Sequence, residues 1–267
     1  MNIKEYYKST AIASLNISLF TAILSVIIFV IMSRFLHSVH VWEATIPFMI
    51  MSCIFFLQFY LNKNRYLHFP EEIRINERPL MDERNVLMTF MPAPTLRIML
   101  FNPKGQLVGE VKDYNTAWYK WFIPNNVMMF LPQKYILLDE QQKEFATFRT
   151  FGFLGGNIEI YNSEGRRIGV YIENVKKSLF RYSGTLYDDE QSERMKVNVS
   201  GYIHSFTISS IDGRRLVSFQ KGYMPLEWSS RFKQLNTPIL SFAEETTNEE
   251  MICIYALCSK FLTYTNN

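Results

Sequence analysis

The chain has 267 residues, with 28 Lys and Arg residues against 25 Asp and Glu residues. Its mean hydropathy of −0.04 hides two chemistries, because residues 9–33 and 44–62 contain no charged side chain and the rest is ordinarily polar. A net charge of +3 over this length makes no strong field for phosphates. The composition therefore excludes a disordered chain, a simple soluble enzyme and a nucleic-acid binder driven by bulk charge.

The two apolar stretches predict a transmembrane hairpin that occupies residues 1–62. At 1.5 Å per residue, helices over about 11–33 and 41–61 are long enough to cross a hydrocarbon core of about 30 Å. Pro47 is expected in the first turn of the second helix, where its missing N–H breaks no helical bond. Two polar residues inside the spans, Asn16 and Gln58, are expected to form hydrogen bonds within the hairpin or within an oligomer.

A cleaved signal peptide is the competing interpretation of the first apolar stretch, because Lys4 and Lys8 give a basic start. The stretch is longer than the usual 7 to 15 residues, and a second apolar segment follows it, which favours the anchored hairpin. Basic residues precede the first helix and follow the second. This distribution predicts a multi-pass protein of the cell membrane with both termini in the cytoplasm.

Residues 63–95 are rich in proline and charge and are predicted to be a linker, although LMTF near Leu87 is compatible with a short strand. Beyond it, four segments alternate apolar and polar residues on both sides of a polar turn, which is typical of β-hairpins. They are LRIMLFNPKGQLVGEV, YILLDEQQKEFATFR, IEIYNSEGRRIGVYI and FTISSIDGRRLVSFQ. With a fifth pair around DDEQSE, at least ten short strands predict an antiparallel barrel or sandwich.

The last apolar segment, MICIYALCSKFL, predicts a helix that is buried on every side. Thr247 and Glu250 form a capping box ahead of it, and Lys260 is its one charged residue. About 12 residues are too few to cross a bilayer, so the surrounding medium has to be protein. A sheet wrapped around this helix satisfies that requirement. The cysteines, Cys53, Cys253 and Cys258, do not suggest a disulfide framework and suit a cytosolic domain.

Hairpins built as strand, D/N-x-x-G, basic residue and strand, followed by a terminal hydrophobic helix, resemble the tubby-like C-terminal fold. The resemblance is to its LURP-one-related and phospholipid-scramblase-like branches and covers Leu96 to Thr263. It implies a mainly-β closed antiparallel barrel over residues 96–267 that encloses its C-terminal helix. It also implies phosphoinositide or phospholipid binding through a basic groove. We find no match to a scramblase calcium segment.

Two groups of basic residues are the candidate headgroup-binding sites. One group follows glycine in two predicted turns, where guanidinium groups can bind lipid phosphate bidentately. The other flanks an apolar dipeptide in a loop suited to an anionic membrane surface. Solvated hairpin ends and an ordinary strand connection are the competing interpretations. The candidates are Arg166, Arg167, Lys176, Lys177, Arg181, Arg214 and Arg215.

The sequence predicts no cofactor, no metal site and no enzymatic activity. The acidic residues from Asp188 to Glu193 lack the spacing of a calcium loop, and no catalytic motif is present. We therefore expect a non-enzymatic module that binds membrane lipid headgroups or a protein partner, and no nucleic acid. The alternative is a lipid-moving or permeability protein in which the transmembrane hairpin forms a homo-oligomer and the barrel regulates it.

Overall fold

The chain divides into two units, residues 1–72 and 73–267, each with its own internal contacts. In this computed structural model the described residues are 1–34, 38–69, 79–93, 95–115, 120, 131–151, 156–174, 181–200, 204–234 and 236–263.

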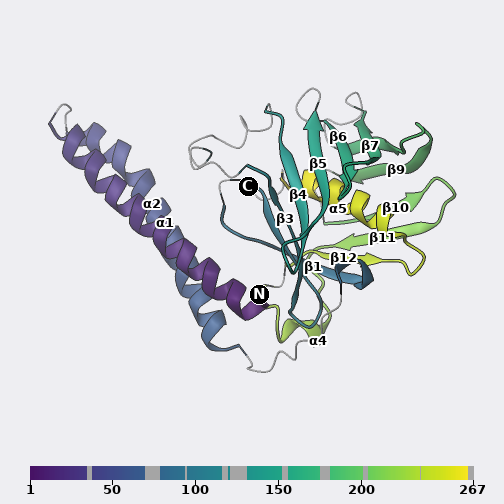
Figure 1. The fold of residues 1–267 in the computed structure, drawn as a ribbon. Coiled ribbons are helices and arrows are strands. Elements are labelled where there is room, and N and C mark those ends of the chain that lie inside the picture. Colours follow the sequence, from purple (N-terminus) through teal and green to yellow (C-terminus); the bar gives the residue numbers. More distant parts are fainter. Residues whose placement is uncertain are drawn as a thin grey trace. The chain divides into compact units, whose positions relative to one another are not determined.

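The first unit is a hairpin of two long helices, α1 (Ile3–Met32) and α2 (Ser38–Leu67) (Figure 1). Both are long and apolar enough to cross a membrane. α1 begins earlier than predicted because Asn2 and Glu5 form a capping box. The Asn2 side chain accepts a hydrogen bond from the Glu5 N–H at 2.9 Å, and the Asn2 N–H donates to the Glu5 carboxylate at 3.0 Å.

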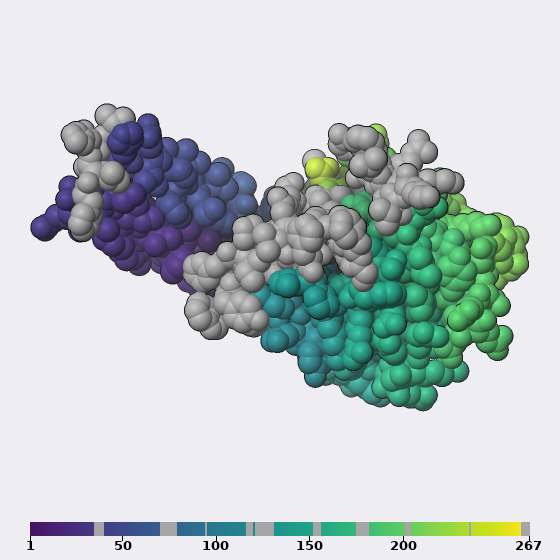
Figure 2. Space-filling model, turned by 90° about the horizontal axis from the view of Figure 1, so that it is seen from above, coloured from purple at the N-terminus to yellow at the C-terminus, as the bar shows by residue number. Residues whose placement is uncertain are grey.

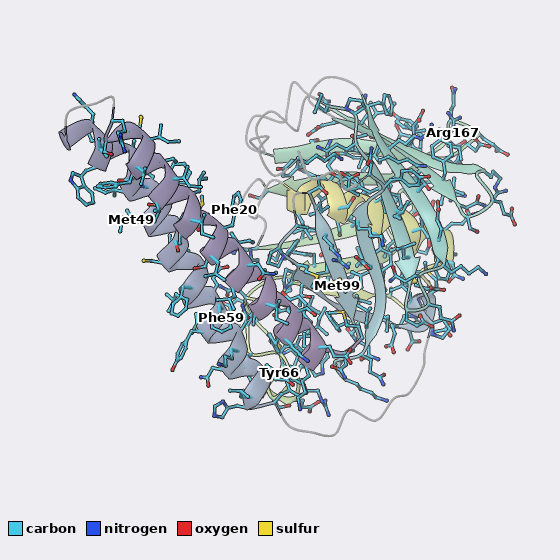
Figure 3. All side chains as sticks on the ribbon, turned by 60° about the vertical axis from the view of Figure 1, so that its left-hand side comes forward. Phe20, Met49, Phe59, Tyr66, Met99 and Arg167 are labelled. Atoms are coloured by element: carbon cyan, nitrogen blue, oxygen red, sulfur yellow. The ribbon has the colours of Figure 1, made fainter. Side chains whose placement is uncertain are left out.

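The helices meet through hydroxyl side chains and present their large apolar side chains outward. The Ser18 hydroxyl donates to the Ser52 carbonyl at 3.0 Å, and the Ser52 hydroxyl donates to the Ser18 carbonyl at 3.0 Å. Thr21 and Ser25 are buried, whereas many large residues are at least 45% exposed. The exposed residues include Ile12, Leu19, Phe20, Ile23, Val26, Val30, Trp42, Met49, Ile54, Phe56 and Tyr60. Phe20 and Met49 are labelled in Figure 3. This arrangement is the reverse of that in a soluble helical pair.

The prediction for Pro47 was wrong. α2 begins at Ser38, so Pro47 lies inside the helix and not in its first turn. The residues from Ser38 to Glu43 are polar enough to suggest a loop, but they continue the helix. Pro47 therefore removes one internal hydrogen-bond donor, the one that would pair with the carbonyl of Glu43.

The second unit is a closed barrel in which each strand pairs antiparallel with the next along the chain, and β12 returns to pair with β1. The predicted mainly-β antiparallel barrel is confirmed. Its strands are β1 (Asn85–Phe90), β2 (Arg97–Phe101), β3 (Leu107–Asp113), β4 (Lys134–Asp139), β5 (Glu144–Phe151), β6 (Asn157–Asn162), β7 (Arg167–Glu173), β8 (Arg181–Tyr187), β9 (Glu193–Ser200), β10 (Ser205–Ser210), β11 (Arg215–Gln220) and β12 (Ile239–Phe242). Two short helices lie outside the sheet. They are η1 (Leu80–Asp82), which precedes β1, and α4 (Leu226–Ser229), which lies between β11 and β12.

The barrel begins before the predicted boundary at residue 96. β1 lies within the segment assigned to the linker and closes the barrel between β12 and β2. Val86, Leu87 and Met88 are all buried, so both faces of β1 are covered. Because both faces are covered, β1 lacks the alternation of apolar and polar residues by which a strand with one exposed face is recognised. At the other end of the linker, α2 continues to Leu67, beyond the predicted end of the hairpin at residue 62.

Five hairpins share one turn geometry. In the β6–β7 turn, the Asn162 carboxamide oxygen accepts from the Glu164 and Arg166 N–H groups at 3.1 and 2.9 Å, and the Gly165 N–H donates to the Asn162 carbonyl at 3.0 Å. The fourth residue of each turn has positive φ, and the strand register shifts beside it, as in a three-residue loop with a bulge. These fourth residues are Gly105, Gln142, Gly165, Gln191 and Gly213.

The helix α5 (Asn248–Thr263) lies inside the barrel, as predicted. Thr247 and Glu250 form the predicted capping box, in which the Thr247 N–H donates to the Glu250 carboxylate at 2.8 Å. Every residue from Met251 to Leu262 is buried. α5 runs through the strands in Figure 1, and little of this yellow segment reaches the surface shown in Figure 2.

The shared turn geometry predicts that substitutions at two equivalent turn positions change the stability of the barrel in opposite directions. Gly213 has φ of 85° and Gln191 has φ of 63°. Gly213→Ala should lower the free energy of unfolding by about 1 kcal/mol, because a Cβ is strained at this φ although no atom lies within 4 Å of it. Gln191→Gly should raise it by up to about 1 kcal/mol.

Urea unfolding of both variants, followed by tryptophan fluorescence, measures these changes. Gly213→Asn is the matched control. It should lower the free energy of unfolding less than Gly213→Ala does, because asparagine tolerates this backbone conformation. Equal effects of the two substitutions would contradict the assignment of strain to φ.

Candidate functional site

The two ends of the barrel differ in their connections. The β6–β7 and β10–β11 turns contact the start of α5, through the side chains of Arg166 and Arg214. The β5–β6 connection and the end of β7 contact Lys260 near the end of α5. We call the first end, which holds the five tight turns, the turn end, and the second the loop end.

At the turn end, arginines from the β6–β7 turn and from β9 converge on Glu249. Arg166 Nη2 lies 2.7 Å from Glu249 Oε1, and Arg194 Nη1 lies 3.3 Å from Glu249 Oε2. Arg194 also contacts Asp188, with Nε and Oδ2 separated by 3.6 Å. One carboxylate at the first turn of α5 therefore joins the β6–β7 turn to β9.

The other predicted arginines of the turns also face carboxylates, with one exception. Arg214 Nη2 lies 3.7 Å from Glu250 Oε1 and 3.9 Å from Asp212 Oδ2. Arg167 Nε lies 3.2 Å from Asp189 Oδ1 (its position is labelled in Figure 3). Arg215 is exposed and forms no ion pair within the described part of the chain.

These pairs hold α5 in place more than they form an open anion site. Arg166 is 63% exposed and Glu249 40% exposed, so each pair contributes about 1 kcal/mol or less. Glu249 and Glu250 also interact favourably with the positive end of the helix dipole. The Arg84 side chain adds a hydrogen bond to the Thr246 carbonyl at 3.1 Å, just before the helix. Three of the four predicted arginines of the turn end, Arg166, Arg167 and Arg214, are thus already matched by acidic groups.

The structure does not bring the seven predicted residues together. Arg166, Arg167, Arg214 and Arg215 lie at the turn end, on two separate hairpins. Arg181 is the first residue of β8 and lies at the loop end, where β8 pairs with the end of β9. The side chain of Arg181 and the whole of Lys176 and Lys177 lie outside the described residues.

Two cations that sequence reasoning missed lie side by side on the outer wall near the loop end. Lys134 opens β4 and is paired in register with Arg149 of β5. Lys134 Nζ lies 3.8 Å from the centroid of the Tyr114 ring, and the Arg149 guanidinium lies 5.5 Å from that of Tyr161. Neither cation has a carboxylate within ion-pair distance among the described residues. The turn that begins at Asp139 fixes the register between β4 and β5. The hairpin sequence therefore already contained the information that places Lys134 beside Arg149.

Inside the loop end, Lys260 forms a closed polar contact. Its ammonium donates to the Gly156 carbonyl and to Glu173 Oε2, the latter at 2.7 Å, and its side chain is 2% exposed. It also lies 5.1 Å from the centroid of the Tyr171 ring. A Cβ at Gly184 would lie 2.6 Å from the Tyr171 hydroxyl oxygen, so the ring position requires glycine there.

In this contact Lys260 stabilises the fold, and its amine is not placed to act as a nucleophile. Burial lowers the pKa of Lys260, while the hydrogen bond and the charge of Glu173 raise it. A buried lysine with a lowered pKa is the type that forms Schiff bases, but this amine is enclosed and already hydrogen-bonded. Burial raises the pKa of the Cys253 thiol to about 12 and raises that of Cys258 as well. Both thiols are therefore protonated at neutral pH and unreactive.

The acidic β8–β9 turn uses its first carboxylate for backbone hydrogen bonds. Asp188 Oδ1 accepts from the Glu190 and Ser192 N–H groups at 3.0 and 2.8 Å. Within the described ranges, no three His, Cys, Asp or Glu side chains gather as metal ligands would. The turn has the same geometry as the other four and needs no cation to form.

The Lys260 contact predicts a pH-dependent defect in Glu173→Gln. Loss of the partner of a buried charge should cost about 3–5 kcal/mol at pH 7. The pKa of Lys260 then falls further, and above this lowered pKa, up to about 10.4, the unfolded chain binds more protons than the folded one. Stability of the variant should therefore rise with pH in this interval, and its deficit should shrink.

Chemical unfolding at pH 7 and pH 9.5 measures the change. The double variant Glu173→Gln, Lys260→Met should recover most of the lost stability, because no buried charge remains. A deficit of the single variant that does not change with pH would contradict the role of Lys260.

No family model matches the sequence, and no curated protein matches it. An X-ray structure of a protein from Arabidopsis thaliana is similar to this chain, with 10% sequence identity and a TM-score of 0.45. The similarity covers 71% of this chain and 97% of that chain.

Proposed function

We propose that this protein is a membrane-anchored tubby-like domain that binds anionic lipid headgroups at the cytoplasmic face of the cell membrane, without catalysis. The observation that carries the proposal is the inverted polarity of the hairpin. Ser18, Thr21 and Ser25 are buried, while Leu19, Phe20 and Ile23 are each more than half exposed. In water this surface would be an aggregation site, whereas in a bilayer it faces hydrocarbon.

The filled barrel favours binding on the outer surface. α5 occupies the interior, and its residues from Met251 to Leu262 are all buried. A ligand inside the barrel would have to displace this helix. The same filling disfavours a lipid path through the barrel, as a lipid-moving protein would need.

The outer cations near the loop end are the preferred headgroup contacts. Lys134 and Arg149 are adjacent and form no ion pair among the described residues, in contrast to Arg166 and Arg214. Glu159 is paired in register with Arg149 but does not lie within ion-pair distance of it. Each lies over a tyrosine ring, and such amphipathic side chains suit a membrane interface. Arg181 begins its strand at the same end. Each such charge near an anionic surface contributes about 1 kcal/mol.

Membrane insertion with both termini in the cytoplasm predicts a labelling pattern. The protein should resist alkaline extraction from membranes. In a Cys53→Ser background, Ser33→Cys in the full-length protein should react with a membrane-impermeant thiol reagent added to intact cells. Lys63→Cys should react only after permeabilisation. The buried Cys253 and Cys258 remain unlabelled because burial raises the pKa of both thiols.

The reverse labelling pattern would invert the orientation and contradict the cytoplasmic placement of the barrel. Release of the protein by alkali would contradict the anchor itself.

Headgroup binding predicts that the barrel, residues 73–267, floats with liposomes that contain phosphatidylserine and phosphoinositide at low salt. Lys134→Gln with Arg149→Gln should weaken this binding about 10- to 30-fold, because two charges near the surface are lost. Raising the salt concentration should also weaken the binding of the unmodified barrel to these liposomes.

The matched control is Lys104→Gln with Lys143→Gln, which removes the same charge from exposed positions at the turn end. This control should bind nearly as well as the unmodified barrel. Equal losses in both variants would indicate attraction by net charge alone. Absence of flotation would contradict lipid binding and leave a protein ligand as the function of the module.

A further inference from the structure

The strongest unexplained feature of the hairpin is Asn16, a polar side chain on the outer surface of α1. It is exposed and forms no side-chain hydrogen bond within the described residues. It lies eight residues beyond Lys8, about 12 Å along the helix, and therefore within the hydrocarbon if the hairpin spans a membrane. An unpaired carboxamide in hydrocarbon costs several kcal/mol.

Asn16 points away from α2. The side of α1 that faces α2 is marked by Ser14, Ser18, Thr21 and Ser25, which are buried. At 100° per residue, Asn16 lies on the opposite side of the helix. No residue of α2 can therefore satisfy its carboxamide, and its partner has to come from another molecule.

The residues around Asn16 form a continuous seam with alternating spacings of three and four. This spacing is that of helices packed as a left-handed pair, and Asn16 is its single polar position. The apolar side chains of the seam are 50–63% exposed. Phe20, labelled in Figure 3, lies one turn beyond Asn16 beside the seam. The seam consists of Ile12, Asn16, Leu19, Ile23, Val26 and Val30.

We propose that two copies of this chain associate in the membrane through this seam, with the two Asn16 carboxamides hydrogen-bonded to each other. The proposal rests on the membrane insertion proposed above. All copies insert with the same orientation, so Asn16 lies at the same depth in each copy. A carboxamide both donates and accepts, so two of them related by a two-fold axis along the membrane normal satisfy each other. A different partner would need its own polar group at this depth.

The test uses full-length protein reconstituted in bilayers at a high lipid-to-protein ratio, with energy transfer between labelled copies as the readout. Asn16→Leu should weaken the dimer at least about fivefold, because the interhelical hydrogen bonds are lost. It leaves a more apolar helix, so insertion is retained. Asn16→Gln keeps a carboxamide and should restore part of the association. Gln58 of α2 lies five residues before Lys63, about 8 Å along the helix, and is therefore nearer the membrane surface than Asn16. Gln58→Leu should leave association unchanged.

Cysteine cross-linking in the same membranes locates the interface. In a Cys53→Ser background, Ile23→Cys should form a disulfide-linked dimer on oxidation. Leu24→Cys, at nearly the same depth but turned by about 100°, should not. Cross-linking of both variants, or of Leu24→Cys alone, would overturn the seam, and so would association unaffected by Asn16→Leu.

Alkaline extraction of the same samples separates the two proposals. Protein that resists extraction but shows no energy transfer is an inserted monomer, which overturns the dimer and leaves the anchor intact. Protein that is released by alkali overturns the anchor.

Discussion

The fold depends on one constraint, the need to surround α5 with protein on every side. This helix has apolar residues around its whole circumference, and its residues Met251–Leu262 are all buried. Each large side chain among them gains about 1.5–3 kcal/mol from burial. A helix against a flat sheet would bury only one side, whereas a closed barrel buries all of them. The closure of β1 on β12 therefore follows from the same requirement as the helix itself.

The helical hairpin contains similar residue types in the opposite arrangement. Its large apolar side chains point outward, and hydroxyl groups such as those of Ser18 and Ser52 form the contact between its helices. In α5 the hydroxyl-bearing residues Tyr255 and Ser259 are buried with the apolar residues around them. Hydrophobicity alone does not distinguish these cases. The position of the small polar residues does, because in the hairpin they lie where the helices meet and not on the outward surface.

The sequence predicted the elements whose two faces differ. The hairpins around Asn162 and Asp188 alternate cleanly, and the capping box at Thr247 marked the start of α5. Prediction was incomplete at β1, where LMTF near Leu87 was recognised as compatible with a short strand but was assigned to the linker and not to the barrel. It missed β12, a strand of four residues. It also misplaced Pro47, because polar residues at the end of a long apolar helix resemble a loop.

The candidate site was the hardest part to predict, because charge was visible in the sequence and its partners were not. The dipeptides Arg166–Arg167 and Arg214–Arg215 look like a phosphate site until α5 places Glu249 and Glu250 beside them. Those glutamates are favoured at the start of the helix by its dipole, and their charge then has to be matched at the adjoining turns. A basic residue after the glycine of these turns therefore follows from the position of the buried helix. By contrast, Lys134 and Arg149 form no ion pair among the described residues, although Glu159 lies opposite Arg149 in the sheet.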